Sequence, residues 1–562
     1  MESLAHMPYL QKHMIHEGTL YSNHFCTVAI CCPARATLWT GRAAHNTNVT
    51  DIFPPYGGFP KVVDEGINDD YLPIWLQESG YNTYYTGKLW NAHNVDNYMA
   101  PYVNGFNSSD FILDPNTYNY LHAVMTRDGR VPVSYKGQYS PDVTAEKAYG
   151  YLDEAMSHDE PWFVGIAPIA PHSHVETFNA SDSTYANTEP KYAERHAHLF
   201  KDYKIPRDAN FNPKTPSGVS WIRKLERLND TVIGYNDEFQ RARLRALQSV
   251  DEMVEKLVKK LEAKGELDNT YIIYTTDNGY HISQHRLNPG KECGFDTDIH
   301  IPLIIRGPGI AKGHKSEAVT AHTDLAPTIM NLAGATRESF DGKPINVHDD
   351  IAAVEERHEH VNIEFWGMGI PEGIYGKYGD LNYEGENTPR RLTGNNTYKG
   401  LRLIGDEYSL YYSVWCTGER EFYDMIRDPF QVNNVLGVSP ALSDPKYELY
   451  GRKFSHVWAR LDALMMVLKS CKQDSCREPW KALHPDGSVR HLRDALAPHF
   501  DEFYAQQPRV QFTSCELGYL VSVEGPQKAH QYGEDDEGAR NAELRKRSPS
   551  SFHYGGELQW WT

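Results

Sequence analysis

The chain has 562 residues, of which 40% are hydrophobic and 23% charged, and this ordinary composition predicts a folded globular protein that buries more than one core. Its formal net charge of -19 argues against a nucleic-acid binder or a protein that docks on anionic membranes, because both need basic patches. No apolar run reaches the roughly 18 residues that a membrane-spanning helix needs.

A motif of unusual composition stands near the start of the chain. The stretch CCPARATLWTG, residues 31–41, places two adjacent cysteines before a proline, and Pro33 in a first turn predicts the start of a helix. Adjacent cysteines rarely pair with each other because the geometry is strained, and no further ligands follow at the spacing of a zinc site. A nucleophilic cysteine of low pKa beside Arg35 is an alternative to buried thiols.

The next segments alternate between helices and short apolar strands. The predicted strands are GYNTYYTG before Lys88, WFVGIA (162–167), YIIYTT (271–276) and PLIIRGPG (302–309). One predicted helix begins near Thr144, and a second covers residues 244–265 and stops at Gly265. A third follows the Asp of AHTDLAPTIMNLAG (321–334). This alternation predicts an α/β fold with helices on both faces of a mostly parallel sheet, and a site beyond the carboxyl ends of its strands.

The rest of the chain predicts loops, a smaller domain and a tail. Residues 176–230 and 366–398 have the composition of long surface insertions, which are plain loops or shape the mouth of a pocket. Short strands from about residue 399 and a helix around 450–469 predict a smaller α+β domain. We therefore divide the chain into a catalytic domain (1–385), a C-terminal α+β subdomain (386–525) and a loosely held tail (526–562).

Signals for the cellular compartment disagree. The N-terminal stretch MESLAHMPYLQKHMIHEG lacks the apolar core of a secretory signal. Glycosylation sequons favour the secretory route and stand at Asn48, Asn107, Asn179, Asn229 and Asn395. Cys471 and Cys476 frame the loop CKQDSC as a local disulfide would, although unpaired thiols are an equal interpretation.

Polar residues follow three of the predicted strands. Asp277 and Asn278 offer hard oxygen ligands of the kind that suits Ca²⁺ or Mg²⁺, although Asp-Asn-Gly is also a common turn. Histidines follow at His172, His174 and His281, and lysines at Lys88 and Lys291. Each of these alone has a bland interpretation as a solvated turn or surface residue.

Taken together, the motifs resemble those of a known family. CCPARATLWTG resembles the signature of the sulfatases, Cys-x-Pro-x-Arg followed by four residues and Thr-Gly. GYNTYYTGK resembles the family's second signature, and APHSH, TTDNGYH and the Gly-Lys at 290–291 follow in family order across roughly residues 20–335. EFYDMIRDPFQVNNV resembles the start of the closing segment of the C-terminal subdomain. Within the family the chain is similar to fungal arylsulfatases related to the glucosamine-6-sulfatases.

The resemblance implies an alkaline-phosphatase-like fold, hydrolysis of a small sulfate ester, and a specific maturation. A formylglycine-generating enzyme would oxidise Cys31 to formylglycine (3-oxoalanine), whose hydrated aldehyde attacks sulfur with one hydroxyl and expels sulfate with the other. Family positions imply that Asp277 and Asn278 bind Ca²⁺ or Mg²⁺, with Asp277 helping to activate the nucleophile, and that Arg35, Lys88 and Lys291 hold the sulfate oxygens. His172 would contact the sulfate or the leaving oxygen, which Lys291 would protonate.

Two departures from the family pattern matter. Many sulfatases place a histidine two residues after the second-motif lysine, where this chain has Trp90; His93 is a candidate acid or base, and His281 a candidate for substrate binding. The family also begins with a buried strand that ends in Asp-Asp and supplies half of the metal site, and no such pattern precedes Cys31. We therefore expect a chain that starts just after that strand, also without its signal peptide, and little sulfatase activity from it.

Two other interpretations stay open on this evidence. Phosphonate monoester hydrolases and phosphodiesterases of the same superfamily also make formylglycine from Cys-x-Pro-x-Arg, and a truncated sulfatase-fold protein could be inactive. The full-length gene product is expected to be secreted or to reach a vacuole or lysosome-like compartment.

Overall fold

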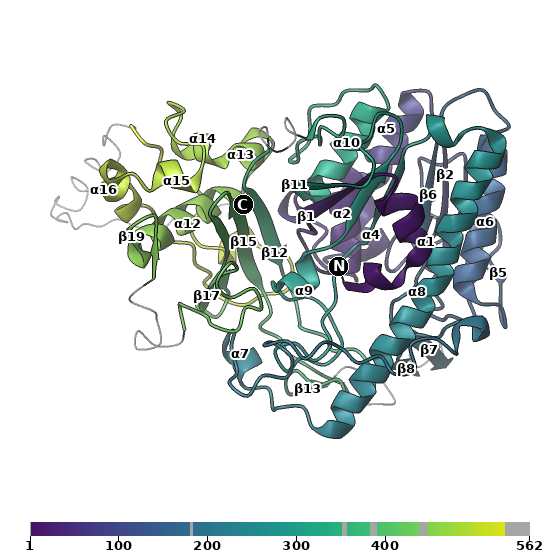
Figure 1. Cartoon of the computed structure of the whole chain (residues 1–562), viewed down its shortest axis with the longest axis horizontal. Coiled ribbons are helices and arrows are strands. Elements are labelled where there is room, and N and C mark those ends of the chain that lie inside the picture. The colour runs from purple at the N-terminus through teal and green to yellow at the C-terminus, as the bar shows by residue number, and fades with distance from the viewer. Residues whose placement is uncertain are drawn as a thin grey trace, which may run out of the picture.

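An α/β body and a C-terminal antiparallel sheet lie side by side in this protein (Figure 1). The computed structural model describes residues 2–179, 184–350, 354, 357–382, 390–437 and 447–533. No helix in this described part is long and apolar enough to cross a membrane.

The first sheet of the body has four strands in the order β11-β1-β10-β9. They are β1 (Thr19–Phe25), β9 (Ile272–Thr275), β10 (Leu303–Arg306) and β11 (His314–Ala321). β1 is parallel to β11 and antiparallel to β10, and β10 is antiparallel to β9. β9 is therefore an edge strand, while Leu303, Ile304 and Ile305 on its neighbour β10 are fully buried, as central strands are.

The second sheet has five strands in the order β5-β4-β3-β2-β6. They are β2 (Asn82–Gly87), β3 (Ser108–Ile112), β4 (Val124–Arg127), β5 (Val133–Ser134) and β6 (Trp162–Ala167). β2 is parallel to both β3 and β6, whereas β3, β4 and β5 pair antiparallel. The two edges of this sheet are β5 and β6.

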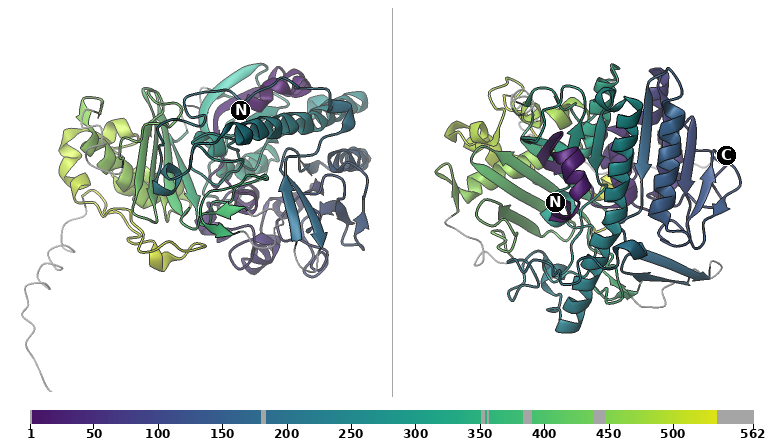
Figure 2. Two further views of the ribbon diagram at one scale, coloured as in Figure 1. Left: turned by 90° about the horizontal axis from the view of Figure 1, so that it is seen from below. Right: turned by 45° about the vertical axis from the view of Figure 1, so that its right-hand side comes forward.

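Helices cover both sheets. The longest, α8 (Asp230–Lys264), begins where the side chain of Asn229 accepts a hydrogen bond from the Val232 amide, and it ends at Gly265 in the left-handed region. It packs against α6 (Ser140–Ala155), and the two run side by side along the outside of the body (Figures 1 and 2). α2 (Cys31–Thr40) and α10 (Leu325–Leu332) pack against each other.

The C-terminal sheet is antiparallel, with the order β12-β15-β16-β17. Its strands are β12 (His360–Phe365), β15 (Tyr398–Gly405), β16 (Tyr408–Trp415) and β17 (Arg420–Asp424). One face packs on α12 (Phe454–Leu468) through leucines such as Leu401 and Leu410. Disulfides join Cys471 to Cys476, which settles the alternatives left by the sequence, and Cys416 to Cys515.

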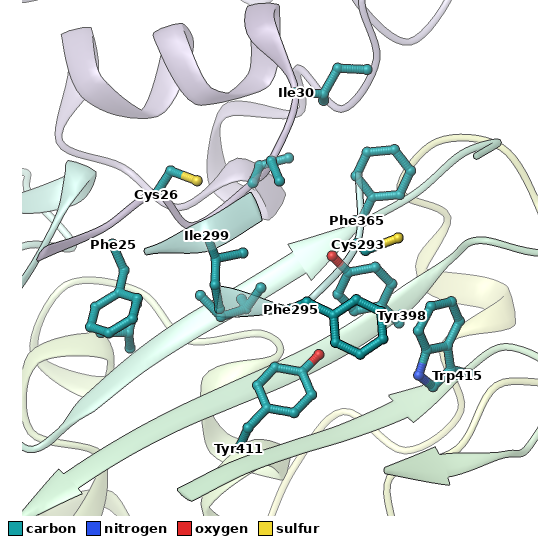
Figure 3. Packing of buried hydrophobic residues seen from close by; sticks show 14 of the residues in the cluster. Phe25, Cys26, Ile30, Cys293, Phe295, Ile299, Phe365, Tyr398, Tyr411 and Trp415 are labelled. Carbon is teal, nitrogen blue, oxygen red and sulfur yellow. The ribbon is translucent and has the colours of Figure 1, made fainter. Parts of the chain in front are cut away.

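The other face of this sheet packs on the body through aromatic side chains (Figure 3). Tyr398 and Trp415 of the sheet share one buried cluster with Phe25, Phe295 and Ile299 of the body. Burial of large rings contributes most of the apolar area at such a boundary, so the two parts form one packed unit.

Shorter elements connect these layers. The helices are η1 (Glu2–His6), α1 (Pro8–Leu10), α3 (Ala44–Thr47), α4 (Gly58–Asp64), α5 (Leu72–Glu78), α7 (Ser220–Arg223), α9 (Asp296–Ile299), α13 (Asp474–Arg477), α14 (Pro479–Leu483), α15 (Leu492–Ala495) and α16 (Asp501–Ala505). The strands are β7 (His174–Asn179), β8 (Thr184–Thr188), β13 (Leu381–Asn382), β14 (Arg391–Leu392), β18 (Glu448–Leu449) and β19 (Arg452–Lys453).

The predicted fold class, α/β with a smaller C-terminal α+β part, is confirmed, and its body is built from two mixed sheets. The predicted strand 162–167 coincides with β6, and β2, β9 and β10 lie inside the other three predicted strands. Helix α8 extends well before residue 244, and α6 starts at Ser140 instead of near Thr144. β1 was not predicted because TLYSNHF is largely polar. The antiparallel sheet already begins at β12, and residues 534–562 of the expected tail lie outside the described part.

Candidate active site

Polar side chains from separate segments meet beside the buried N-terminal end of α2. Cys31 is the first residue of that helix. Lys88 follows the end of β2, His172 lies in the turn after β6, and Asp277 follows β9. Lys88, His172 and Asp277 line one cavity, together with Lys291. The sequence motifs that were matched separately therefore come together in space.

Arg35 and Asp277 form a buried ion pair. The Nε and Nη2 atoms of Arg35 lie 2.9 and 2.8 Å from Oδ2 of Asp277, and its Nη1 donates to the backbone oxygen of Lys88 at 2.6 Å. The turn into Lys88 needs Gly87, whose φ is +107° and where a Cβ would come within 2.1 Å of the Ala167 oxygen. The guanidinium is thus held from two sides before any ligand binds.

His172 lies against the ring of Tyr118. The two rings are stacked, with centroids 3.9 Å apart, and the Tyr118 hydroxyl is 3.9 Å from the Cys31 Sγ. His172 Nδ1 is 2.9 Å from the backbone oxygen of Ser173, and an oxygen acceptor requires the proton to be on Nδ1. Nε2 is then an acceptor, 3.4 Å from the Lys291 ammonium and facing the cavity.

Lys291 is held by a carboxylate from a distant loop. Its Nζ donates to Oε1 of Glu372 at 2.6 Å, and the Tyr280 hydroxyl donates to Oε2 of the same group at 2.6 Å. The guanidinium of Arg243 stacks on the Tyr280 ring at 3.9 Å. Glu372 belongs to the 366–398 segment, for which the sequence left open a plain loop or the mouth of a pocket, and this part of it reaches the candidate site.

The charges set the ionisation of the site. Burial raises the pKa of the Asp277 carboxyl, but Arg35, Lys88 and Lys291 lower it by more, so Asp277 is ionised. Burial also raises the pKa of the Cys31 thiol, and the two lysines lower it to about 5. The site is therefore built to stabilise negative charge at the position of Cys31.

This predicts how unmodified Cys31 reacts. In protein made without a formylglycine-generating enzyme, we expect iodoacetamide to alkylate Cys31 at a rate that is nearly constant above about pH 6 and falls below pH 5. The sign follows from the lowered pKa, because thiolate predominates above about 5. Peptide mass spectrometry at several pH values measures the rate.

The buried thiols Cys32 and Cys293 are internal controls for this experiment. Burial raises the pKa of Cys32 to about 12 and that of Cys293 well above the ordinary value, so neither should react in the folded protein. If the alkylation rate of Cys31 still rises tenfold per pH unit between pH 6 and pH 8, the lowered pKa of Cys31 is contradicted, because an ordinary thiol behaves in that way.

Asp277 and Asn278 fit part of a divalent-cation site. Asn278 Oδ1 is buried and has no hydrogen-bond partner among the described residues, which is what an unused metal ligand looks like. Ca²⁺ takes six to eight oxygen ligands, however. Within the described ranges, no close group of three acidic, His or Cys ligands includes Asp277. These two residues can thus offer two oxygen ligands, fewer than a Ca²⁺ site takes.

Two histidine candidates lie away from the cavity. His93 is buried, with its ring 4.7 Å from that of Phe59, and burial lowers its pKa to about 4. His281 has no exposed surface; Nδ1 contacts the Asp298 carboxylate at 2.9 Å, and Nε2 lies 2.5 Å from the Tyr378 hydroxyl. Neither residue lines the cavity that the other candidates share. A catalytic role for His93 or substrate binding by His281 would require these side chains to move.

Sequence reasoning missed Tyr118, Tyr280 and Glu372. Tyr118 lies in an irregular loop after β3, and Glu372 in a Gly- and Tyr-rich loop, and neither stands at a strand end or in a recognisable motif. Only Tyr280, three residues after Asp277, stands in a quoted motif, TTDNGYH, where sequence reasoning assigned it no role. The signal for such residues is spatial, so a sequence pattern could not have found them.

Comparisons with known proteins agree with this geometry. The family model described as Sulfatase matches residues 2–335. An arylsulfatase of Volvox carteri is 36% identical over 91% of this chain and 78% of its own length. The sulfatase ppz1 of Metarhizium majus (strain ARSEF 297) is 39% identical over 76% of this chain and 89% of its own length. N-acetylglucosamine-6-sulfatase of Bos taurus is 30% identical over 82% of this chain and 79% of its own length.

Solved structures share the fold. A protein solved with its substrate D-glucosamine-2-N,6-O-disulfate superposes with a TM-score of 0.58 at 20% identity, covering 77% of this chain and 88% of the other. A phosphonate monoester hydrolase from Silicibacter pomeroyi superposes with a TM-score of 0.52 at 18% identity. The match covers 77% of this chain and 87% of the hydrolase.

Proposed function

This chain belongs to the sulfatases, enzymes that hydrolyse sulfate esters, and we propose that it acts on aryl sulfates through a formylglycine made from Cys31. One observation carries the proposal. The Cys31 thiol is buried at the start of α2, next to a cavity that contains Lys88, Lys291 and His172. Two ammonium groups, a histidine and an aromatic wall around one position suit an anionic tetrahedral group better than a neutral ligand.

The Cys31 Sγ marks the position where formylglycine would carry its hydroxyl groups. When present, formylglycine supplies a hydrated aldehyde whose two hydroxyls serve attack on sulfur and release of sulfate. Arg35 supports this position and is held in place by Asp277 and the Lys88 backbone. Lys88 and Lys291 place two ammonium groups where the sulfate oxygens gain charge, and charge-assisted hydrogen bonds of this kind are stronger than neutral ones.

Lys291 is the proposed acid for the leaving oxygen. Burial lowers its pKa, but Glu372 and Cys31 raise it by more, so its ammonium stays protonated at neutral pH. His172 presents Nε2 toward it, and this nitrogen can accept a hydrogen bond from the substrate or from Lys291. Asp277 and Asn278 would hold Ca²⁺ or Mg²⁺, which when bound would polarise a sulfate oxygen.

Glu372 positions Lys291 and sets its proton affinity. In Glu372→Gln we expect the alkaline limb of the kcat/KM profile to move to lower pH, because burial then lowers the pKa of Lys291 without the opposing carboxylate. A pH profile on an aryl sulfate measures this.

A matched variant for Glu372→Gln is Glu419→Gln, which removes a partly buried carboxylate that pairs with Arg223 instead. Its alkaline limb should coincide with that of the wild type. If the alkaline limb of Glu372→Gln also stays in place, Lys291 is not the group that titrates there.

The chain is also proposed to pass through the secretory route. Two disulfides lie in the C-terminal part, and such bonds persist in oxidising compartments. The sequon residues Asn107, Asn229 and Asn395 are exposed, so a glycan would meet solvent there.

The function is tested by coexpression with a formylglycine-generating enzyme. We expect a hydrazide probe to label the peptide that contains Cys31. At the low rate expected from an incomplete set of metal ligands, we expect the protein to cleave 4-nitrophenyl sulfate faster than bis(4-nitrophenyl) phosphate. Cys31→Ala is the matched control and should show neither label nor turnover. Faster cleavage of the phosphodiester would show that phosphodiesters, not sulfate esters, are the preferred substrates. If the probe does not label the peptide, formylglycine is not part of the mechanism.

A further inference from the structure

One aromatic side chain touches Cys31 and two of the groups that surround it. Tyr118 lies in the loop after β3 and lines the cavity of the candidate site. Its ring stacks on that of His172 with centroids 3.9 Å apart, and the Lys88 ammonium lies 4.8 Å from the centre of the same ring. A ring stacked so closely leaves no room for an ammonium on the same face, so Lys88 occupies the opposite face. The hydroxyl at the tip of the ring lies 3.9 Å from the Cys31 Sγ.

A neighbouring amide fixes the direction of this hydroxyl. The Nδ2 of Asn91 donates a hydrogen bond to the Tyr118 oxygen at 2.8 Å. A phenol oxygen that accepts a bond from one side turns its own hydrogen away from that donor. Among the described residues, the only acceptor within hydrogen-bond distance of this hydroxyl is the Cys31 sulfur, which accepts at longer range than an oxygen because the atom is larger.

Backbone contacts hold the ring in this place. The Val175 amide donates to the Tyr118 backbone oxygen at 3.1 Å, and the Tyr120 hydroxyl donates to the His172 backbone oxygen at 2.8 Å. Both bonds join the loop of Tyr118 to the turn that carries His172. The ring therefore stays in its stack without help from its hydroxyl, so a role of the hydroxyl can be separated from a role of the ring.

The hydroxyl of Tyr118 is a phenol and not a phenolate. Burial raises the pKa of Tyr118 well above its ordinary value, and the charge at Cys31 raises it further. A neutral phenol beside an anionic position acts as a hydrogen-bond donor, and such donors stabilise charge most strongly where water is excluded. Tyr118 is thus suited to stabilise a negative charge at position 31 and not to remove a proton from it.

We propose that Tyr118 is a further catalytic residue, whose hydroxyl donates a hydrogen bond to the nucleophilic atom at position 31, and that Asn91 is the positioning residue that directs it. This inference deepens the proposed function and rests on it. In the mature enzyme the acceptor is an oxygen of the residue made from Cys31, and the bond strengthens as that oxygen gains charge. Tyr118 keeps its proton throughout, so no covalent bond to it forms or breaks. In the immature protein the acceptor is the Cys31 thiolate, which makes the contact measurable without turnover.

The contact is tested on unmodified protein, made without a formylglycine-generating enzyme. Alkylation of Cys31 by iodoacetamide is followed by peptide mass spectrometry between about pH 4 and pH 8. In Tyr118→Phe we expect the midpoint of the profile to rise by about half a pH unit or more, because the thiolate loses a donor. Tyr151→Phe is the matched control, since this buried hydroxyl donates to Asp110 instead, at 2.7 Å, and its variant should keep the wild-type midpoint. An unchanged midpoint in Tyr118→Phe would overturn the proposal.

A second variant tests the direction of the hydroxyl. Asn91→Ala removes the donor that turns the Tyr118 hydrogen toward Cys31, so the midpoint should rise, but by less than in Tyr118→Phe. The double variant should match Tyr118→Phe alone, because Asn91 acts through the hydroxyl. A midpoint that falls in Asn91→Ala would show that Tyr118 donates to Asn91 instead, and would overturn the proposal. The other polar groups that face Cys31 are the same in all variants, namely Lys88, Lys291, Asp277 and His172.

Turnover of 4-nitrophenyl sulfate is measured separately, on protein that carries formylglycine, with rates divided by the labelled fraction. The kcat of Tyr118→Phe should fall by about tenfold or more while KM changes little, because the hydroxyl contacts the nucleophile and not the substrate. An unchanged kcat beside a raised alkylation midpoint would overturn the catalytic role, since the contact would then serve only the thiol. If wild type and Tyr151→Phe turn over no sulfate ester either, the proposed function fails and the catalytic role with it, whereas the alkylation profiles still decide whether Tyr118 donates to position 31.

Discussion

Replacing Lys291 with alanine is expected to lower kcat for an aryl sulfate by about 10²- to 10⁴-fold, the usual contribution of a positioned general acid. The loss should depend on the leaving group. Phenolate, a poor leaving group, needs protonation by Lys291 more than 4-nitrophenolate does, so the fold-loss should be larger for phenyl sulfate than for 4-nitrophenyl sulfate. Steady-state kinetics of both substrates, on protein carrying formylglycine, measure the two losses.

The matched variant is Lys312→Ala, which removes an exposed lysine whose partner is Glu17. It should keep wild-type rates with both substrates. Equal losses for phenyl and 4-nitrophenyl sulfate in Lys291→Ala would contradict the role as an acid and leave Lys291 as a sulfate-binding group only, because a contact to the sulfate oxygens does not sense the leaving group.

Glu364→Ala is expected to destabilise the protein by about 3 kcal/mol, since it leaves the Lys399 ammonium buried without its main counter-charge. The Lys399 Nζ lies 2.8 Å from Oε2 of Glu364, and both side chains have no exposed surface. His45 Nδ1 contacts the same carboxylate at 2.8 Å. Glu524 remains 3.8 Å from Lys399, which limits the loss. Urea unfolding at pH 7 measures the difference in free energy of unfolding.

The pH dependence of this effect has a definite sign. Burial raises the pKa of Glu364, but His45 and Lys399 lower it by more, to about 2. A carboxyl whose pKa is lowered by folding contributes stability above its unfolded value, near 4.3, and loses it as the pH falls toward 2. The difference between wild type and Glu364→Ala should therefore narrow between about pH 5 and pH 2.

Two variants separate the buried pair from general damage to the core. Glu17→Ala removes one partner of the exposed pair with Lys312 and should cost less than about 1 kcal/mol. The double variant Glu364→Leu with Lys399→Met should recover much of the loss, because apolar residues can replace a buried ion pair. A Glu364→Ala variant within 1 kcal/mol of wild type would show that Glu524 already compensates Lys399.

The sequence by itself determined the elements with strong local patterns and the residues at their ends. β6, β9 and β10 are apolar runs between turn residues, α8 is periodic and stops at Gly265, and the polar groups after β2, β6 and β9 were found because strand ends carry sites. Family resemblance then connected Cys31 to Lys88, His172, Asp277 and Lys291. These features depend on short segments, so one sequence is enough to find them.

Only the tertiary structure decided which distant groups meet. β1 forms although its sequence is polar, because β10 and β11 pair with it on both sides. Glu372 reaches Lys291 from a loop with no pattern, and His281 is buried against Asp298 instead of facing the cavity. The cavity that β6 and β9 line is likewise invisible in either strand, since it depends on how the two sheets pack. Such features follow from long-range packing, which no local sequence pattern encodes.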